Sequence, residues 1–460
     1  VGDKAGDAIG VGNSNTLVGQ AAGGALTDGD NNVAIGASTM AQDDLGQGST
    51  AVGAGALSSQ NMASEALTKN VGIGYQSGFY NVTGTSNSFL GYRAGFGASG
   101  QSNSNNVGVG QSALLGITTG SGNIAIGSNA GASITDADTN TAVGNNALSL
   151  SVSAQSNTAI GVASMQNTTT AHTNVAIGGE TMGGITTATV QDATAVGYAA
   201  FKGSSSTTTG TNGTTAIGRK ALFSLTSGSA NTAIGYEALE LEDAGGNNVA
   251  VGYQALTNQN NDNGMNTAVG KASGAAITTG HSNTLVGSGS GATLQSGYQN
   301  TLIGRDADAT SGKINATAVG YGTIAQADDS VTLGNASVSD VYMSSDKGAK
   351  VLAGGIAFTG SELTVASGAV TATGSYHRID TEGDASTDTL ITINGGVEGQ
   401  LLVLQSAGSA RDTTLEDTGD AGGNLFLNGD FTLSHAQDSI TLLYSSADSG
   451  WIEVSRSDNG

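Results

Sequence analysis

The sequence is poor in the residues on which ordinary globular domains depend. Its 460 residues include no cysteine and no proline, only 4% are aromatic and only 11% are charged, whereas a typical soluble domain has about 25% charged residues and about 5% proline. So few bulky side chains exclude a thick hydrophobic core, but a thin core repeated in many layers needs only a few apolar residues per layer. The lack of cysteine excludes disulfides, which a stacked core with a continuous hydrogen-bond ladder does not need.

Hydrophobicity and charge argue against two kinds of partner, the membrane interior and nucleic acid. No run approaches the roughly 20 apolar residues of a membrane helix, so we expect no membrane insertion. The formal net charge is −23, from 37 acidic and 14 basic residues. Nucleic acid is therefore not expected as a partner, because phosphate contacts need basic patches. We expect the negative charge to favour solubility and to keep separate particles apart. The sequence starts inside a repeat, and we expect it to be a processed product or part of a longer chain.

A short phrase, Asn-Thr-Ala-Ile/Val-Gly, recurs from residue 1 to about residue 335. Its glycine, called here the anchor glycine, occurs 20 times, and 12 of the 19 intervals between anchors have the same 17-residue length. Val, Ile or Leu precedes every anchor, and Asn stands four residues before it in 14 of 19 cases. β-Branched residues and turn formers dominate and no 3.6-residue period appears, so each repeat predicts a short strand, a glycine corner and a loop. The anchors are Gly2, Gly19, Gly36, Gly53, Gly74, Gly91, Gly110, Gly127, Gly144, Gly161, Gly178, Gly197, Gly218, Gly235, Gly252, Gly270, Gly287, Gly304, Gly320 and Gly334.

A 17-residue unit is too small to bury a core alone, but neighbouring units can share one if their strands pair in parallel. We therefore predict an all-β fold with a parallel β-solenoid of about 19 repeats over residues 1–335. Each anchor would occupy a corner that needs a positive φ or a close backbone approach, and the recurrent Asn would form an amide ladder along the axis. The representative anchors are Gly19, Gly36, Gly127, Gly144, Gly161, Gly235 and Gly252, with Asn123, Asn140, Asn157 and Asn231.

Two positions of the repeat vary together. The residue two before the anchor is usually Ala, and the residue four after it is then often large. The order is reversed in four repeats, which pair Leu17 with Gly23, Phe89 with Gly95, Leu285 with Gly291, and Leu302 with Asp308. In repeats with Ala two residues before the anchor, the large residue four after it is, for example, Leu57, Met165, Phe201, Leu222 or Leu256. We infer that the two positions share one volume in the core, which either of them fills.

The Asn-x-Ala-Ile-Gly phrase resembles the head repeat of trimeric autotransporter adhesins of the YadA type. It is still more similar to the 17-residue version found in phage and bacterial tail-fibre proteins. The resemblance covers the whole repeat region, up to about residue 335. It implies a β-roll, left-handed as in the adhesin heads, with three chains wound about one axis. The adhesin heads favour a shorter period, of which the 14-residue interval between Gly320 and Gly334 is the one example here.

This resemblance implies a structural protein rather than an enzyme. It would be a host-attachment fibre of a phage tail, located on the virion and outside the cell, with the solenoid as a rigid trimeric spacer. Its partners would be two further copies of itself, other fibre or tail proteins, and a glycan or protein on the host surface. Two alternatives stay open, namely a trimeric adhesin on a bacterial cell surface and a polysaccharide-degrading tailspike.

The repeat phrase stops after Gly334, and two further segments follow. Residues 336–375, including 337–342 and 354–358, predict a neck or connector, and no heptad pattern supports a coiled coil. Residues 376–460 predict a small antiparallel β-sandwich or β-prism that serves as a cap or tip. Its strand candidates, separated by Gly, Asp and Asn turns, are residues 389–393, 400–405, 424–427, 431–433, 439–444 and 451–454.

The search for reactive sites is largely negative. The sequence has no Gly-x-Ser-x-Gly, His-Glu-x-x-His or Walker motif, and we expect no cofactor. His172 and His281 are expected in solvated loops. We expect exposed loop charge at the paired acids, and a structural cation shared between three chains stays open. These acids are Asp136 and Asp138, Glu240 with Glu242 and Asp243, Asp306 and Asp308, and Asp328 and Asp329.

The candidates for contact with a receptor lie in the C-terminal segment, residues 376–460. They are side chains that combine a ring or a charge with a hydrogen-bonding group, namely Tyr376, His377, Arg378, Tyr444 and Trp451. Trp451 lies on an alternating strand, where a place in the core is the more common role for such a large side chain.

Overall fold

The computed structural model describes residues 2–186, 190–203, 210–339, 341, 357–358, 360–418 and 422–459. Over these residues the fold is all-β, as predicted, apart from the short 3-10 helix η1 (Glu382–Asp384). The chain divides into two compact units, Val1–Val341 and Tyr342–Gly460. Part of the predicted neck, including residues 342–356, lies outside the described residues.

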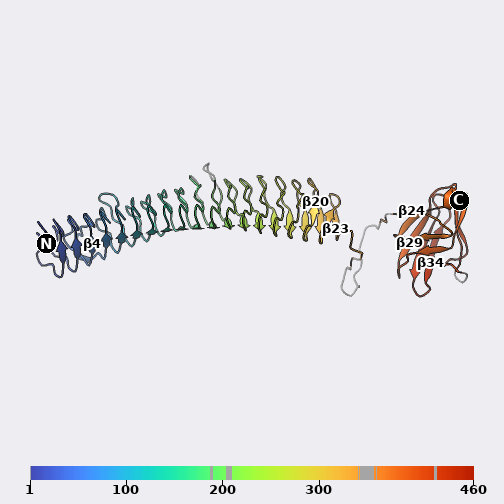
Figure 1. Cartoon of the computed structure of the whole chain (residues 1–460), viewed down its shortest axis with the longest axis horizontal. Helices are drawn as coiled ribbons and strands as arrows, with labels where there is room; N and C mark the ends of the chain where they lie inside the picture. The colour runs from blue at the N-terminus through green and yellow to red at the C-terminus, as the bar shows by residue number, and fades with distance from the viewer. Residues whose placement is uncertain are drawn as a thin grey trace. The chain divides into compact units, whose positions relative to one another are not determined.

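The first unit is a parallel β-solenoid in which each repeat makes one coil (Figure 1). A three-residue strand ends just before each anchor glycine from Gly19 onward and pairs in parallel with the strand of the next coil, so that Thr141 faces Thr158 and Ala142 faces Ala159. Nineteen such strands form one sheet. They are β1 (Thr16–Val18), β2 (Val33–Ile35), β4 (Thr50–Val52), β6 (Val71–Ile73), β7 (Ser88–Leu90), β8 (Val107–Val109), β9 (Ile124–Ile126), β10 (Thr141–Val143), β11 (Thr158–Ile160), β12 (Val175–Ile177), β13 (Thr194–Val196), β14 (Thr215–Ile217), β15 (Thr232–Ile234), β16 (Val249–Val251), β17 (Thr267–Val269), β18 (Thr284–Val286), β19 (Thr301–Ile303), β21 (Thr317–Val319) and β23 (Val331–Leu333).

Two minor parallel pairs lie elsewhere on the coils. One joins β3 (Gly46–Gln47) to β5 (Ala66–Leu67), and the other joins β20 (Asp308–Ala309) to β22 (Ile324–Ala325). The rest of each coil consists of turns whose backbone groups bond to the coils on either side. The solenoid predicted from the repeat is therefore confirmed.

The core of the solenoid is a narrow column of small and medium side chains. In one coil it receives Ala142 from the strand and then Ala147 and Leu148 from the turn after the anchor, all fully buried. Successive coils add equivalent residues, so the core is one continuous hydrophobic cluster over most of the length. A thin core of this kind explains why the chain needs so few aromatic residues.

The predicted exchange of volume between two core positions is confirmed. A Cβ atom placed on Gly291 would lie 2.2 Å from Cδ2 of Leu285, and one on Gly23 would lie 2.9 Å from Cδ2 of Leu17. The larger side chain of each pair therefore occupies the space of the missing one. Asp308 leaves that space differently, because its carboxylate turns outward and accepts the N–H of Thr293 at 3.1 Å.

Each coil turns through left-handed backbone after the anchor. The second and fourth residues beyond Gly144, Asn146 and Leu148, have φ values of 57° and 51°. Their N–H groups point in opposite directions along the axis. Asn146 donates to Ser128 O in the preceding coil and Leu148 donates to Ser164 O in the following coil, both at 3.0 Å. The left-handed conformation costs a non-glycine residue roughly 1–2 kcal/mol of free energy. The hydrogen bonds between coils stabilise it.

The second unit is a small module of three sheets. The largest has the strand order β24-β26-β29-β33-β34-β31, beside the pair β25-β28 and the three-stranded sheet β27-β30-β32. The strands are β24 (Ser361–Thr364), β25 (Ala369–Thr371), β26 (Tyr376–Asp380), β27 (Thr387–Leu390), β28 (Thr392–Asn394), β29 (Leu401–Ser406), β30 (Asp412–Leu415), β31 (Leu425–Phe426), β32 (Phe431–Leu433), β33 (Ser439–Ser445) and β34 (Gly450–Ser457).

The strand pairing of this module is mixed, which corrects the expectation of an antiparallel sandwich or prism. β24, β26 and β29 run parallel to one another, and only then do β33 and β34 add antiparallel. The chain between Ser361 and its partner His377 is long enough for the crossover that parallel strands need, and β25 lies within it. Alternation identifies strands but not their partners, so the sequence favoured the simpler hairpin order. β24 and β25, placed in the neck by the sequence, are part of these sheets.

Candidate functional site

The anchor glycines stack along the solenoid at the closest approach between coils. The seven representative anchors, Gly19, Gly36, Gly127, Gly144, Gly161, Gly235 and Gly252, all have φ between 128° and 141°. A Cβ atom on Gly144 would lie 2.4 Å from the carbonyl oxygen of Gly161. Both the backbone angle and the contact with the next coil therefore require glycine.

The recurrent asparagines form the predicted amide ladder, buried along one side of the core. The side chain of Asn140 accepts a hydrogen bond from the N–H of Asn157 at 3.0 Å and donates through Nδ2 to Ala154 O at 2.6 Å. Asn140 N in turn donates to Oδ1 of Asn123 at 3.0 Å. Asn231 repeats the arrangement with Asn248 N and Gly245 O. Each rung thus satisfies backbone groups in two coils, which buried polar groups need.

The residue before each anchor forms a second column, on the outside of the same sheet. Its side chain is Val, Ile or Leu in every repeat, yet Ile160 and Ile177 are each 38% exposed. We call these residues the apolar column. The members that are at least 37% exposed are Val18, Ile35, Ile73, Leu90, Ile126, Ile160, Ile177, Ile217, Ile234, Val269, Val286, Ile303 and Leu333. A continuous apolar line of this length on the surface of a chain indicates an interaction surface.

Aromatic rings next to the apolar column stack on one another. Tyr75 lies on Tyr92 with centroids 5.5 Å apart, and Tyr236 lies on Tyr253 at 5.2 Å. Arg219 covers the Tyr236 ring at 5.4 Å. Each of these rings therefore has at least one face against a neighbour, and the stacks extend the ordered surface along the axis.

Among the described residues, two coils carry a buried carboxylate where several other coils carry Leu or Ile, and sequence reasoning missed both. Asp43 and Glu242 lie seven residues after an anchor and are fully buried. Gln60, one coil later, donates to Asp43 Oδ2 at 2.5 Å, and Asn70 of the amide ladder donates to Gln60 Oε1 at 2.8 Å. The same relay recurs from Asn266 to Gln259 at 2.9 Å and from Gln259 to Glu242 at 2.6 Å.

The relays lie beside lengthened loops. In two other coils the N–H of the tenth residue after the anchor donates to the next coil, as Gly120 N does to Thr135 O at 3.1 Å. The coils that follow those of Asp43 and Glu242 are longer than the usual repeat, by four residues and by one. There the carboxylates accept the corresponding N–H groups, Gly46 N at 3.0 Å and Gly245 N at 2.6 Å. Burial raises the pKa of both carboxyl groups, and the hydrogen bonds that they accept offset this only in part.

Glu242 corrects the expectation that its acidic cluster is exposed loop charge. The reason is its register, because the seventh position after the anchor points into the core. In the sequence, Gln259 indicates this inward position, because it stands at the same seventh place after the anchor of the next coil. Four of the other paired acids are exposed, as expected, namely Asp136, Asp306, Asp328 and Asp329. The remaining four are half-buried, namely Asp138, Glu240, Asp243 and Asp308.

The structure separates the five predicted receptor-contact residues. Trp451 is fully buried and donates through Nε1 to Ile393 O at 3.0 Å, so its place is in the core of the module. His377 is also buried, which corrects its prediction as an exposed contact. Its Nε2 accepts N–H groups from Thr373 and Gly374 at 3.2 and 3.0 Å, and Nδ1 lies 3.1 Å from Ser361 O. The ring therefore caps a turn and joins β24 to β26.

The remaining three predicted residues reach the surface to different degrees. Tyr376 is half-buried and donates to Gln405 Oε1 at 2.5 Å. Tyr444 is half-buried against Trp451, with ring centroids 5.2 Å apart. Arg378 is exposed and donates to Ala407 O. Arg378 alone of the five is exposed.

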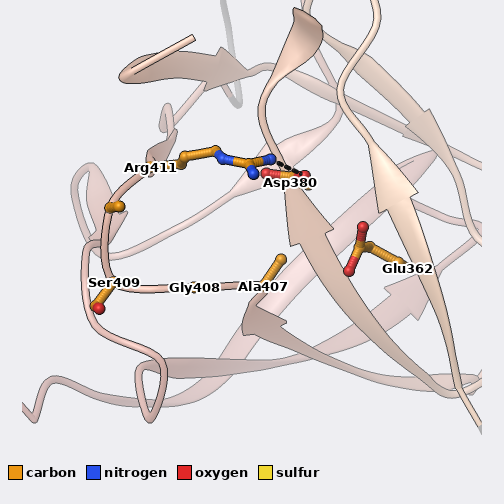
Figure 2. A pocket seen from close by; sticks show the side chains of 7 residues that line it. Glu362, Asp380, Ala407, Gly408, Ser409 and Arg411 are labelled. Carbon is orange, nitrogen blue, oxygen red and sulfur yellow. Dashed lines mark hydrogen bonds and ion pairs between the residues drawn. The ribbon is translucent and has the colours of Figure 1, made fainter. Parts of the chain in front are cut away.

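The loop that Arg378 contacts through Ala407 O lines a small polar cavity of about 200 Å³ in the module. Its lining comes from Glu362, Asp380 and the loop of residues 407–411 (Figure 2). Arg411 of that loop is ion-paired with Asp380 and, at 2.6 Å, with Asp384. The charged side chains on this side of the cavity are thus engaged with each other, and they stabilise the loop.

No protein-family model, curated protein or solved structure matches the chain. The resemblance of the repeat phrase to tail fibres and adhesins therefore stays a hypothesis.

The described part of the chain has no candidate metal cluster and no membrane-spanning helix. No three His, Cys, Asp or Glu residues there converge as a metal site requires. No helix among these residues is long and apolar enough to cross a lipid bilayer. His172 and His281 are half-buried at the loop bridges, where His281 stacks on Tyr298 with centroids 5.0 Å apart.

Proposed function

We propose that this chain is a structural attachment fibre of a phage tail, in which three copies form a rigid extracellular spacer. The solenoid is the spacer, and the C-terminal module is its cap or its host-contacting tip. The observation that carries the proposal is the apolar column. It runs along the sheet of a chain that is otherwise strongly acidic, and it is the surface on which sister copies would pack.

The energetics of the column favour many identical contacts. Each Val or Ile that loses its remaining exposed area contributes a fraction of the roughly 1.5–3 kcal/mol gained on burying the whole side chain. Summed over almost every coil and three chains, these small terms hold a long assembly together. The 17-residue period and the resemblance of the phrase to tail-fibre repeats support the phage assignment, and the left-handed winding follows from the same resemblance.

A rigid trimer also suits attachment. A stiff spacer carries a weak binding surface away from its base, and threefold symmetry multiplies weak contacts by avidity. No catalytic residue is assigned, because an attachment fibre binds its host without chemistry. Two sister copies, other fibre or tail proteins and a glycan or protein of the host surface are the partners this function requires.

The test is the mass of the native particle by light scattering. We expect three times 44.8 kDa and an elongated shape. A variant with Ile160→Lys and Ile177→Lys places charges in two neighbouring layers of the column and should lower the melting temperature of the trimer or dissociate it. Gln155→Lys adds a single lysine charge at an exposed position outside the column and should have little effect. A monomeric native particle would rule out the proposal.

A further inference from the structure

The C-terminal module has an apolar face of its own, opposite its core. Leu401 on β29 faces Leu443 on β33, and Leu443 faces Ile452 on β34. Their sequence neighbours Leu402, Leu442 and Trp451 are buried, so alternation turns the three residues to the outer surface of the sheet. Leu401 is 46% exposed and Ile452 is 36% exposed.

Val454 extends this row along β34 and is 56% exposed. It lies at a bulge, where the pairing of β33 with β34 shifts register between Thr441 and Leu442. We call Leu401, Leu443, Ile452 and Val454 the outer patch. The nearest charges on β34, Glu453 and Arg456, form an ion pair with each other, so the outer patch itself carries no charge.

We infer that the outer patch is where the modules of sister chains meet, which rests on the proposed trimeric fibre. Charge favours this occupant. Copies of a chain with a net charge of −23 repel one another except through uncharged surfaces. The outer patch is such a surface, and so is the apolar column of the solenoid.

The size of the outer patch favours the same occupant. Four partly exposed side chains offer on the order of a few hundred Å². A complex between freely diffusing proteins buries roughly 800 Å² on each partner, so the patch alone is too small to capture one. Sister modules are already joined through their solenoids, and at the roughly millimolar effective concentration of a tethered partner a weak contact is enough.

The absence of cysteine allows a clean test on the full-length chain. Leu401→Cys carries a spin label into the outer patch, and Val454→Cys is a second site there if the first disturbs folding. Thr432→Cys is the matched control. It lies at an exposed position in the middle of β32, in the three-stranded sheet. Label-to-label distances are measured by pulsed EPR on particles whose mass is determined in parallel.

In a particle of trimeric mass, labels at position 401 or 454 should be much closer together than labels at position 432. If the particle is a trimer but all the distances are equally long, the modules do not meet through the outer patch, and this inference is wrong while the fibre proposal stands. A monomeric particle overturns both proposals. Addition of a glycan or receptor that changes the distances only at 401 and 454 would assign the patch to the host instead and would also overturn the inference.

Discussion

Phe89 fills the space that a side chain on Gly95 would need. A Cβ atom on Gly95 would lie 2.4 Å from Cε1 of the Phe89 ring, which is fully buried. Most other coils fill this space in the opposite order, with Ala two residues before the anchor and a large residue four after it. Leu57 is an example of the large residue, and its φ is 50°.

This pair predicts a double-mutant cycle. Phe89→Ala should lower the free energy of unfolding by about 3–5 kcal/mol because it leaves a cavity. Gly95→Leu should lower it by about 1–3 kcal/mol because it overpacks the same site. The double variant reproduces the ordinary order of Ala and Leu and should be within about 1.5 kcal/mol of the wild type. Denaturant unfolding of all four proteins measures the coupling. Simple addition of the two costs would show that the positions do not share one volume.

The amide ladder gives a second prediction. Asn140→Ala removes the partners of Asn157 N and Ala154 O, both inside the structure. Each buried group left without a partner costs about 1–3 kcal/mol. Asn145→Ala, at an exposed position beside the same strand, should change stability by no more than about 0.5 kcal/mol. Equal effects of the two substitutions on the unfolding midpoint would mean that the ladder adds nothing to stability.

The buried relays give the solenoid an unusual pH dependence. In the unfolded chain Asp and Glu titrate near pH 3.9 and 4.3, and burial raises the pKa of Asp43 and of Glu242 in the folded protein. The folded state then keeps protons that the unfolded state has lost. Stability therefore falls as the pH rises from about 4 through the raised pKa values and levels off above them.

The variant with Asp43→Asn and Glu242→Gln should lose this dependence, whereas Asp136→Asn, in an exposed loop, should keep it. Thermal unfolding of the solenoid is followed from about pH 4.5, just above the ordinary carboxylate values, to about pH 8, and it measures how steeply stability changes with pH. A slope that is the same in the double variant as in the wild type would show that other groups cause it.

The C-terminal module should respond to acid in the opposite sense. Burial raises the pKa of Asp438, but the N–H groups of Asn459, His435 and Ser434 and the charge of His435 outweigh it and hold this pKa below its ordinary value. The stability that Asp438 provides is present above about pH 3.9, its unfolded value, and is lost as the pH falls through the lowered pKa.

Asp438→Asn should therefore lower the melting temperature of the module at neutral pH and remove part of its loss in acid. Asp448→Asn, in an exposed turn of the same module, is the control. Circular dichroism in the near ultraviolet follows the buried Trp451 and so separates this transition from that of the solenoid. An unchanged transition at neutral pH would contradict the role of Asp438.

The sequence predicted the solenoid in detail because each structural position is represented by an equivalent residue in every repeat. Twenty anchors define the corner, the strand and the ladder, and the alternative Phe89–Gly95 packing stands out against them. The C-terminal module is built once, so its alternation identified strands such as β29 and β33 but not the parallel pairing of β24 with β26. Asp43 and Glu242 were missed because a carboxylate is normally a sign of the surface, and only the register of Gln60 and Gln259 indicates otherwise.

The left-handed turns at residues such as Asn146 and Leu148 have a consequence for how the length of this protein can change. The hydrogen bonds of these turns go to the coil on either side. Whole repeats can therefore be gained or lost by unequal recombination, each altering the reach of the spacer by about 4.8 Å, while a deletion of part of a repeat would break the register of the coils next to it.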